Sequence, residues 1–122
     1  MDEIGCIEII DKGDTAVVAF RAVSISASEG IDGASEQIRR YIEENHPKKI
    51  VFDFEQVKFF SSQVLGLLLD VRAKLQMYDG EVVISAINPQ LHRIFKITSL
   101  DKIFRFFPDK ETAVKTDEHK SN

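Results

Sequence analysis

The sequence predicts a single α/β domain in which a mixed β-sheet of about five strands packs with about four helices, in the order ββαβαβαβα. The chain has 122 residues, enough for one domain, and 43% of them are hydrophobic, which supplies one core. Strand-like and helix-like segments alternate from Lys48 onward, as in parallel sheets with helical crossovers. An opening hairpin adds an antiparallel pair, so the sheet is expected to be mixed.

The first two strands are predicted to form this hairpin. Cys6–Ile10 and Thr15–Arg21 are short β-prone runs, and the polar segment with Lys-Gly-Asp between them has the composition of a turn. Cys6 is the only cysteine, so it cannot form an intramolecular disulfide, which favours a reducing compartment. Ala22–Gly33 is rich in Ser, Ala, Gly and Asp and is expected to be a loop.

Two helices and two strands are predicted in the middle of the chain. The helices run from about Ala34 to Asn45 and from Gln63 to about Tyr78, and the strands span Lys48–Glu55 and Glu81–Ile87. Asp32 or Ser35 is expected to cap the first helix, which ends before Pro47. Gly80 is expected to end the second helix in the left-handed conformation.

A third helix, a last strand and a short helix complete the domain. Asn88 is placed as the cap of the third helix, with Pro89 at its first position. The last strand is predicted over Lys102–Phe107, and Asp109 caps the short helix that follows.

The domain is expected to span residues 1–115, followed by a polar, disordered tail at 116–122. Phe104, Phe106 and Phe107 are expected to be buried under the last helix. Exposure of these rings would instead mark a homodimer face, and this alternative stays open.

Composition and spacing argue against several functional classes. The net charge is −4 and the basic residues are scattered, so no nucleic-acid partner is expected. The three histidines lie far apart and no phosphate-binding loop or nucleophile elbow occurs, so neither metal, cofactor nor catalysis is expected. The chain lacks a secretion signal and a long apolar run, which favours a cytoplasmic protein without membrane insertion.

Asp53 is a carboxylate placed in a predicted central strand, on the side opposite Ile50, Phe52 and Phe54. Burial there would perturb its pKa, which is compatible with a functional role. The simpler interpretation, which we prefer, is a carboxylate hydrogen-bonded to a neighbouring loop. A small enzyme that uses Asp53 or a loop serine is a further hypothesis. It is disfavoured because no base, metal or phosphate loop accompanies either group.

Ser61 and Ser62 stand where the connection Gln56–Ser62 turns into a helix, after two phenylalanines that must pack somewhere. One interpretation is ordinary N-capping, in which a serine oxygen accepts a hydrogen bond from the first helical turn. The other is phosphorylation, because a phosphate at this position would meet the positive end of the helix dipole. Local features leave both interpretations open.

Three segments together resemble the STAS domain, the family of anti-sigma factor antagonists. Ile50–Leu69 is similar to the family's core strand, loop and serine-containing helix start. Gly80–Pro89 resembles its next strand and Asn-Pro helix start, and Leu91–Phe104 resembles its third helix and closing segment. The resemblance extends from about residue 48 to residue 114 with the elements in matching order.

The resemblance implies an anti-sigma factor antagonist that regulates sigma-factor-dependent transcription in a bacterium. Such a protein binds an anti-sigma factor serine kinase while unphosphorylated and is released when a loop serine is phosphorylated. A cognate phosphatase resets the switch. Aligning Leu65–Gly66 with the family's Leu-Gly places the phosphoacceptor at Ser62, with Ser61 in reserve. The implied partner-binding residues are Ser24, Ser26, Ser61, Ser62, Gln63, Leu65, Gly66, Asn88 and Pro89.

The chain departs from the family pattern around this serine. Ser61 replaces the usual Asp, and Gln63 and Val64 replace the usual Ser-Gly. The loop after the second strand also differs and is longer. These departures favour a second hypothesis, a STAS scaffold or accessory subunit of a signalling or lipid-transport complex that is not switched by phosphorylation.

Overall fold

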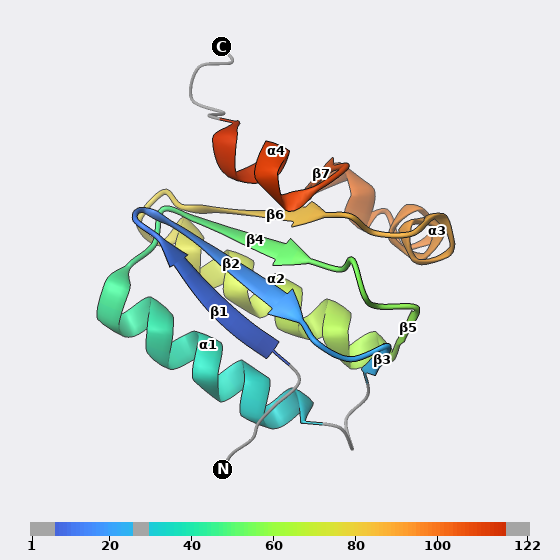
Figure 1. Cartoon of the computed structure of the whole chain (residues 1–122), viewed down its shortest axis with the longest axis horizontal. Helices are drawn as coiled ribbons and strands as arrows, with labels where there is room; N and C mark the ends of the chain where they lie inside the picture. The colour runs from blue at the N-terminus through green and yellow to red at the C-terminus, as the bar shows by residue number, and fades with distance from the viewer. Residues whose placement is uncertain (1–6, 26–29, 117–122) are drawn as a thin grey trace.

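The computed structural model describes residues 7–25 and 30–116, and it confirms a mixed five-stranded sheet with four helices (Figure 1). The strand order is β1-β2-β4-β6-β7, in which β1 is antiparallel to β2 and every other pair is parallel. The strands of this sheet are β1 (Ile7–Lys12), β2 (Thr15–Phe20), β4 (Lys49–Asp53), β6 (Glu81–Ser85) and β7 (Arg105–Phe107). Two further strands, β3 (Ser24–Ile25) and β5 (Phe59–Phe60), form a separate parallel pair.

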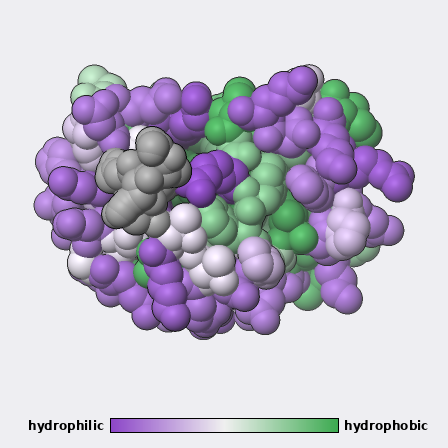
Figure 2. Space-filling view, turned by 90° about the horizontal axis from the view of Figure 1, so that it is seen from above, coloured by the Kyte–Doolittle hydropathy of each residue, from purple (hydrophilic) through white to green (hydrophobic). Residues whose placement is uncertain are grey.

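The helices cover the two faces of the sheet unequally (Figure 1). Three of them pack on one face and the fourth, with six residues, on the other. They are α1 (Ile31–Asn45), α2 (Ser62–Gln76), α3 (Pro89–Ile97) and α4 (Lys110–Lys115). Alternation along β4 produces this division, because Ile50 and Phe52 face the large core under α1–α3 while Val51 faces α4. Seen from the α4 side, polar residues surround a central apolar area (Figure 2).

A series of phenylalanine rings runs through the large core toward the ends of the parallel strands. The ring centroids of Phe20 and Phe54 lie 5.0 Å apart, and those of Phe54 and Phe60 lie 5.8 Å apart. Phe60 then meets Phe95 of α3 edge-on at 6.2 Å. Edge-to-face and tilted ring pairs at these distances stabilise the fold in addition to the stabilisation from burying the rings. The rings therefore connect the sheet, the β3–β5 pair and α3.

The predicted hairpin is confirmed, although its turn is tighter than expected. β1 continues to Lys12, so the turn consists of Gly13 and Asp14 alone. Gly13 has φ 84°, and its N–H donates to Oδ1 of Asp11 at 2.8 Å. The polar residues at the end of β1 join the strand because their side chains are exposed while their backbone pairs with β2. Cys6 lies outside the described residues.

The start of α1 differs from the prediction. The helix begins at Ile31 and its N-cap is Gly30, with φ 95°, without a side-chain cap hydrogen bond. Asp32 therefore lies in the first turn rather than at the cap, and Ser35 lies beyond the first turn. The reason is that Ile31 is buried and extends the apolar face of the helix toward its N-terminus. The predicted C-terminal end is confirmed, with His46 at the C-cap.

The end of α2 also differs from the prediction. Asp79, not Gly80, takes the left-handed conformation, with φ 66°. Gly80 is instead required by space, because a Cβ there would lie 3.1 Å from the Leu75 side chain. Close packing, rather than backbone handedness, accounts for this glycine.

The last strand is shorter than predicted, and a 3₁₀ turn over Leu100–Lys102 (η2) occupies the segment before it. The expectation that all three phenylalanines lie under the last helix is wrong. Phe104 and Phe106 pack in the large core against Phe95, and only Phe107 packs with the α4 side. The η2 turn comes before β7, and successive residues of β7 point to opposite faces of the sheet. Phe106 and Phe107 therefore pack on opposite faces.

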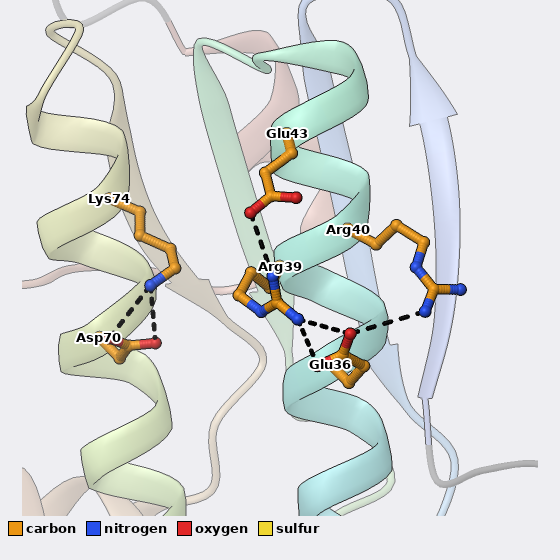
Figure 3. Close-up of polar contacts among 6 residues, drawn as sticks. All are labelled: Glu36, Arg39, Arg40, Glu43, Asp70 and Lys74. Atoms are coloured by element: carbon orange, nitrogen blue, oxygen red, sulfur yellow. Dashed lines mark hydrogen bonds and ion pairs between the residues drawn. The ribbon is translucent and has the colours of Figure 1, made fainter.

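The outward faces of α1 and α2 carry ion pairs at helical spacing (Figure 3). Arg39 lies between Glu36 and Glu43, and Lys74 pairs with Asp70 at 3.3 Å. These side chains are largely exposed, so each pair contributes only a few tenths of a kcal/mol, roughly 0.3–0.5. None of the helices in the described ranges is both long and apolar enough to span a bilayer.

Candidate functional site

The two serines at the start of α2 have different surroundings. Ser61 occupies the N-cap with extended backbone, but its side chain makes no capping hydrogen bond. Its Oγ is buried without a hydrogen-bond partner among the described atoms. Ser62, the first residue of the helix, is exposed. The expectation of side-chain capping is therefore wrong here, because Ser61 turns its hydroxyl inward, and only Ser62 presents a hydroxyl to solvent.

The β3–β5 pair holds this helix start in place. The backbone N–H groups of Lys58 and Phe59 donate to the carbonyl of Val23 at 2.8 and 3.1 Å, and that of Ser61 donates to Ile25 at 2.9 Å. Ile25 is fully buried and anchors the pair on the core. The segment after β2, which was predicted to be a loop, thus includes a short strand that pairs beside the serines.

Ser24 of β3 is exposed and pairs in register with Phe59, three residues before Ser62. Ser26 lies outside the described residues. Gln63 and Gly66 are exposed, whereas Leu65 is half-buried against the core. The structure therefore brings Ser24 and the exposed first turn of α2 together.

Val64 stands where the family has glycine, and the structure shows how it is accommodated. Its side chain is fully buried in the large core under α2. It therefore adds packing at the base of the helix and leaves the outer surface around Ser62 unobstructed. A Cβ added at Gly66 would meet nothing within 4 Å, so that glycine faces open space.

Asn88 and Pro89 begin α3 as predicted. The Asn88 Oδ1 accepts a hydrogen bond from the Leu91 N–H at 2.9 Å, which confirms the cap. Its Nδ2 donates to the carbonyl of Val57 at 3.2 Å, which ties the start of α3 to the connection leading into β5. Pro89 is exposed. α3 lies at the same end of the sheet as β3 and β5 (Figure 1), and among the described residues no hydrogen bond joins Asn88 or Pro89 to Ser62.

Two exposed apolar side chains belong to this surface and were not predicted from the sequence. Phe59 is 62% exposed and Val23 is 52% exposed, and a backbone hydrogen bond joins the two residues. The expectation that both phenylalanines of the connection would pack is wrong for Phe59. Successive residues of a strand point to opposite sides, so burial of Phe60 turns Phe59 outward. That alternation was the signal available in the sequence.

Asp53 lies at the end of β4, outside this surface, on the side facing α4. Its Oδ1 accepts a hydrogen bond from the Ser85 hydroxyl of the neighbouring strand β6 at 3.2 Å, and the carboxyl also accepts a backbone hydrogen bond from Glu55, in the turn after β4. Lys110 Nζ lies 3.9 Å from its other oxygen. Burial raises the pKa of the Asp53 carboxyl, and Lys110 and Ser85 oppose this only in part. This geometry is that of a buried structural carboxylate.

We expect Asp53→Asn to raise the free energy of unfolding at pH 7. Because the pKa of Asp53 is higher in the folded state than its ordinary 3.8, ionisation penalises folding as pH rises above that value. The gain should therefore disappear at pH values below 3.8, where the carboxyl is protonated in both states. Urea unfolding of both proteins across this pH range measures the difference. Glu55→Gln, at the exposed carboxylate that also pairs with Lys110, is the control. If the free energy of unfolding of Asp53→Asn, minus that of wild type, were lower at pH 7 than at low pH, the raised pKa of Asp53 would be contradicted.

A mixed five-stranded sheet with four helices in this order defines a domain of the STAS type. Residues 11–113 match the STAS domain family model, and the chain belongs to the STAS family.

Solved structures support the same fold. The chain matches SpoIIAA, the Bacillus cell fate determinant, in its phosphorylated form at 19% identity with a TM-score of 0.71, covering 88% of this chain and 96% of that one. It matches an anti-sigma factor antagonist from Mycobacterium paratuberculosis at 24% identity with a TM-score of 0.76, covering 88% and 89%. It also matches a sulfate transporter family protein from Wolinella succinogenes at 10% identity with a TM-score of 0.67, covering 85% and 84%.

Proposed function

We propose that this protein is an anti-sigma factor antagonist that acts in the bacterial cytoplasm. Unphosphorylated, it binds an anti-sigma factor that is also a serine kinase; phosphorylated on Ser62, it dissociates, and a cognate phosphatase restores binding. The domain of residues 1–115 would carry this function. The observation on which the proposal mainly rests is that Ser62 is exposed at the start of α2 while the neighbouring Ser61 hydroxyl is buried.

The position of Ser62 allows a phosphate without a change of fold. A phosphoserine carries about −1.5 to −2 charges, and the N-terminus of a 15-residue helix presents a positive dipole end. The helix start lacks a side-chain cap, so backbone N–H groups of its first turn can donate to phosphate oxygens, except that of Val64, which donates to the Ser61 carbonyl at 3.0 Å. The modification would therefore be tolerated by the domain and would alter only its outer surface.

The same position allows a phosphate to disrupt a partner. Phe59 and Val23 provide apolar contact area beside Ser62, and large exposed rings of this kind often contribute most of an interface's free energy. Burying a dianion next to such contacts costs several kcal/mol in desolvation and repulsion. A cost of about 3 kcal/mol already lowers affinity more than a hundredfold.

The first test maps phosphorylation. The protein is incubated with ATP-Mg²⁺ and lysate from its own source, and modified residues are located by mass spectrometry. We expect phosphate on Ser62, its loss in Ser62→Ala and its retention in Ser61→Ala, because the Ser61 hydroxyl is buried. Phosphate on Ser61 alone, or an unmodified helix start, would contradict the proposal.

The second test measures the affinity of the recovered kinase for variants of this surface. Ser62→Glu should weaken binding about a hundredfold, whereas Ser62→Gln, of similar size without charge, should weaken it far less. Phe59→Ala should weaken binding at least about tenfold while leaving the domain folded. Isothermal titration calorimetry gives each dissociation constant. If Ser62→Glu and Ser62→Gln bound the kinase with equal affinity, negative charge at residue 62 would not control binding.

The alternative is a STAS scaffold or accessory subunit of a signalling or lipid-transport complex. Ser61, Gln63 and Val64 in place of the family residues favour it, as does the fold shared with a sulfate transporter family protein. On this hypothesis Ser62→Glu leaves partner affinity unchanged, while Phe59→Ala still weakens it. The two experiments above therefore separate the alternatives.

A further inference from the structure

β1 is the only long strand at an edge of the five-stranded sheet. The opposite edge strand, β7, has three residues and is followed directly by Pro108, which cannot donate to a strand ladder. β1 has six residues without proline, and no other described segment pairs with its outer side. Such an edge presents a row of backbone donors and acceptors to another strand.

The hairpin determines which residues of β1 present these groups. With Gly13 and Asp14 as a two-residue turn, Lys12 and Thr15 are the hydrogen-bonded pair next to it. Alternation then directs the backbone groups of Glu8 and Ile10 toward β2 as well. The groups of the intervening residues, Ile9 and Asp11 among them, point outward.

We propose that β1 is the interface of a homodimer in which the β1 strands of two copies pair in antiparallel orientation around Ile10. In this register Ile9 exchanges backbone hydrogen bonds with Asp11 of the second copy, and the two Ile10 residues face each other across the two-fold axis. Pairing of this kind is isologous and closes at two copies. It is independent of the phosphorylation switch proposed above.

Charge complementarity selects this register and this partner. Pairing around Ile10 places Glu8, which also pairs with Arg21 of its own chain, directly opposite Lys12 of the second copy, twice in the dimer, on the same face as Ile10. The other registers compatible with the outward groups place Glu8 opposite itself, Glu8 opposite Ile10, or Ile10 opposite Lys12, depending on whether the pairing is centred on Glu8, Ile9 or Asp11. None of them sets opposite charges against each other on this face. The partially buried Ile10 would also cover its counterpart beside the apolar patch formed with Val17.

The α1 side of the edge is compatible with the same pairing. Ile9 lines a shallow groove between β1 and α1, together with Arg40 and Tyr41. Arg40 extends from α1 at this side of the helix (Figure 3). Asp11 of the second copy, opposite Ile9, would lie at this groove, which is also lined by Glu36 and Glu44, and Arg40 pairs with Glu36 of its own helix at 3.5 Å. Charge complementarity therefore selects the register only through the Glu8–Lys12 pairs on the other face.

Charge reversal on the full chain tests the proposal. We expect wild type to sediment as a dimer, and Glu8→Lys and Lys12→Glu each to raise the dimer dissociation constant at least about tenfold, because each creates two like-charge pairs. An equimolar mixture of the two variants restores both attractions, so it should form a heterodimer of near wild-type affinity. Both residues are exposed, and thermal melts check that each variant remains folded.

Cross-linking tests the register. Non-hydrogen-bonded antiparallel pairs have Cα atoms about 4.5 Å apart, within the range of a disulfide. In a Cys6→Ser background, Ile10→Cys should form a disulfide-linked dimer on mild oxidation, whereas Ile9→Cys should not link to itself. A monomer at all concentrations, or a dimer insensitive to charge reversal and without the Ile10→Cys cross-link, would overturn the proposal.

Discussion

Phe54→Ala is expected to lower the free energy of unfolding by about 4 kcal/mol, the largest effect of any substitution considered for this domain. The Phe54 side chain is fully buried and packs against Phe20 and Phe60. Its removal loses the transfer free energy of the ring and leaves a cavity between the sheet and the β3–β5 pair. Urea unfolding followed by circular dichroism measures the change.

Phe59→Ala is the matched control, because it removes the same side chain from a position that is 62% exposed. Its stability should lie within about 0.5 kcal/mol of wild type. If both substitutions cost the same, Phe54 would not be the core residue that connects the sheet to the β3–β5 pair. The comparison also ensures that a loss of partner binding in Phe59→Ala is not a loss of fold.

Lys49→Met is expected to cost about 3 kcal/mol and to loosen α4. Lys49 is a charged residue buried at the start of β4, only 7% exposed. Its Nζ donates to the carbonyl of Ala113 at 2.8 Å and to that of Thr116, at the C-terminal end of α4. A cation is favourable at this end of a helix, and methionine keeps the aliphatic volume while leaving these carbonyls without their donor.

Hydrogen exchange followed by mass spectrometry locates the effect of Lys49→Met. Amide exchange should accelerate in Lys110–Lys115 and change little in α1–α3, which pack on the other face. Lys48→Met, at the exposed neighbouring position, should change neither stability nor exchange. Unaltered exchange in α4 for Lys49→Met would show that the apolar contacts of Ala113 suffice to hold the helix.

The candidate site depends on a few long-range backbone contacts. The β3–β5 pair joins residues more than thirty positions apart, and its hydrogen bonds to Val23 and Ile25 orient the segment that enters α2. This orientation buries the Ser61 hydroxyl and exposes Ser62 and Phe59. The phosphorylation switch that we propose depends on this arrangement, because it leaves one of the two hydroxyls accessible to solvent.

Local chemistry allowed much of the fold to be predicted from the sequence. The Gly-containing turn between β1 and β2, the alternation of Ile50, Val51 and Phe52, and the caps at Asn88 and Asp109 each depend on neighbouring residues alone. A cap or a turn is decided by hydrogen bonds within a few residues, and an alternating strand by its own pattern. The resemblance of Ile50–Leu69 to the STAS signature located Ser62 within the chain.

By itself, then, the sequence determined the class of fold, the order of its elements and the position of the serine pair. The tertiary structure decided which of Ser61 and Ser62 faces solvent, that Phe59 is exposed, that Gly30 rather than Asp32 caps α1, and that no described segment pairs with the outer side of β1. Such outcomes depend on which distant segment packs against a residue, for example Ile25 beside Ser61. Burial is a property of the assembled chain, so neighbouring residues with similar side chains can differ in it completely.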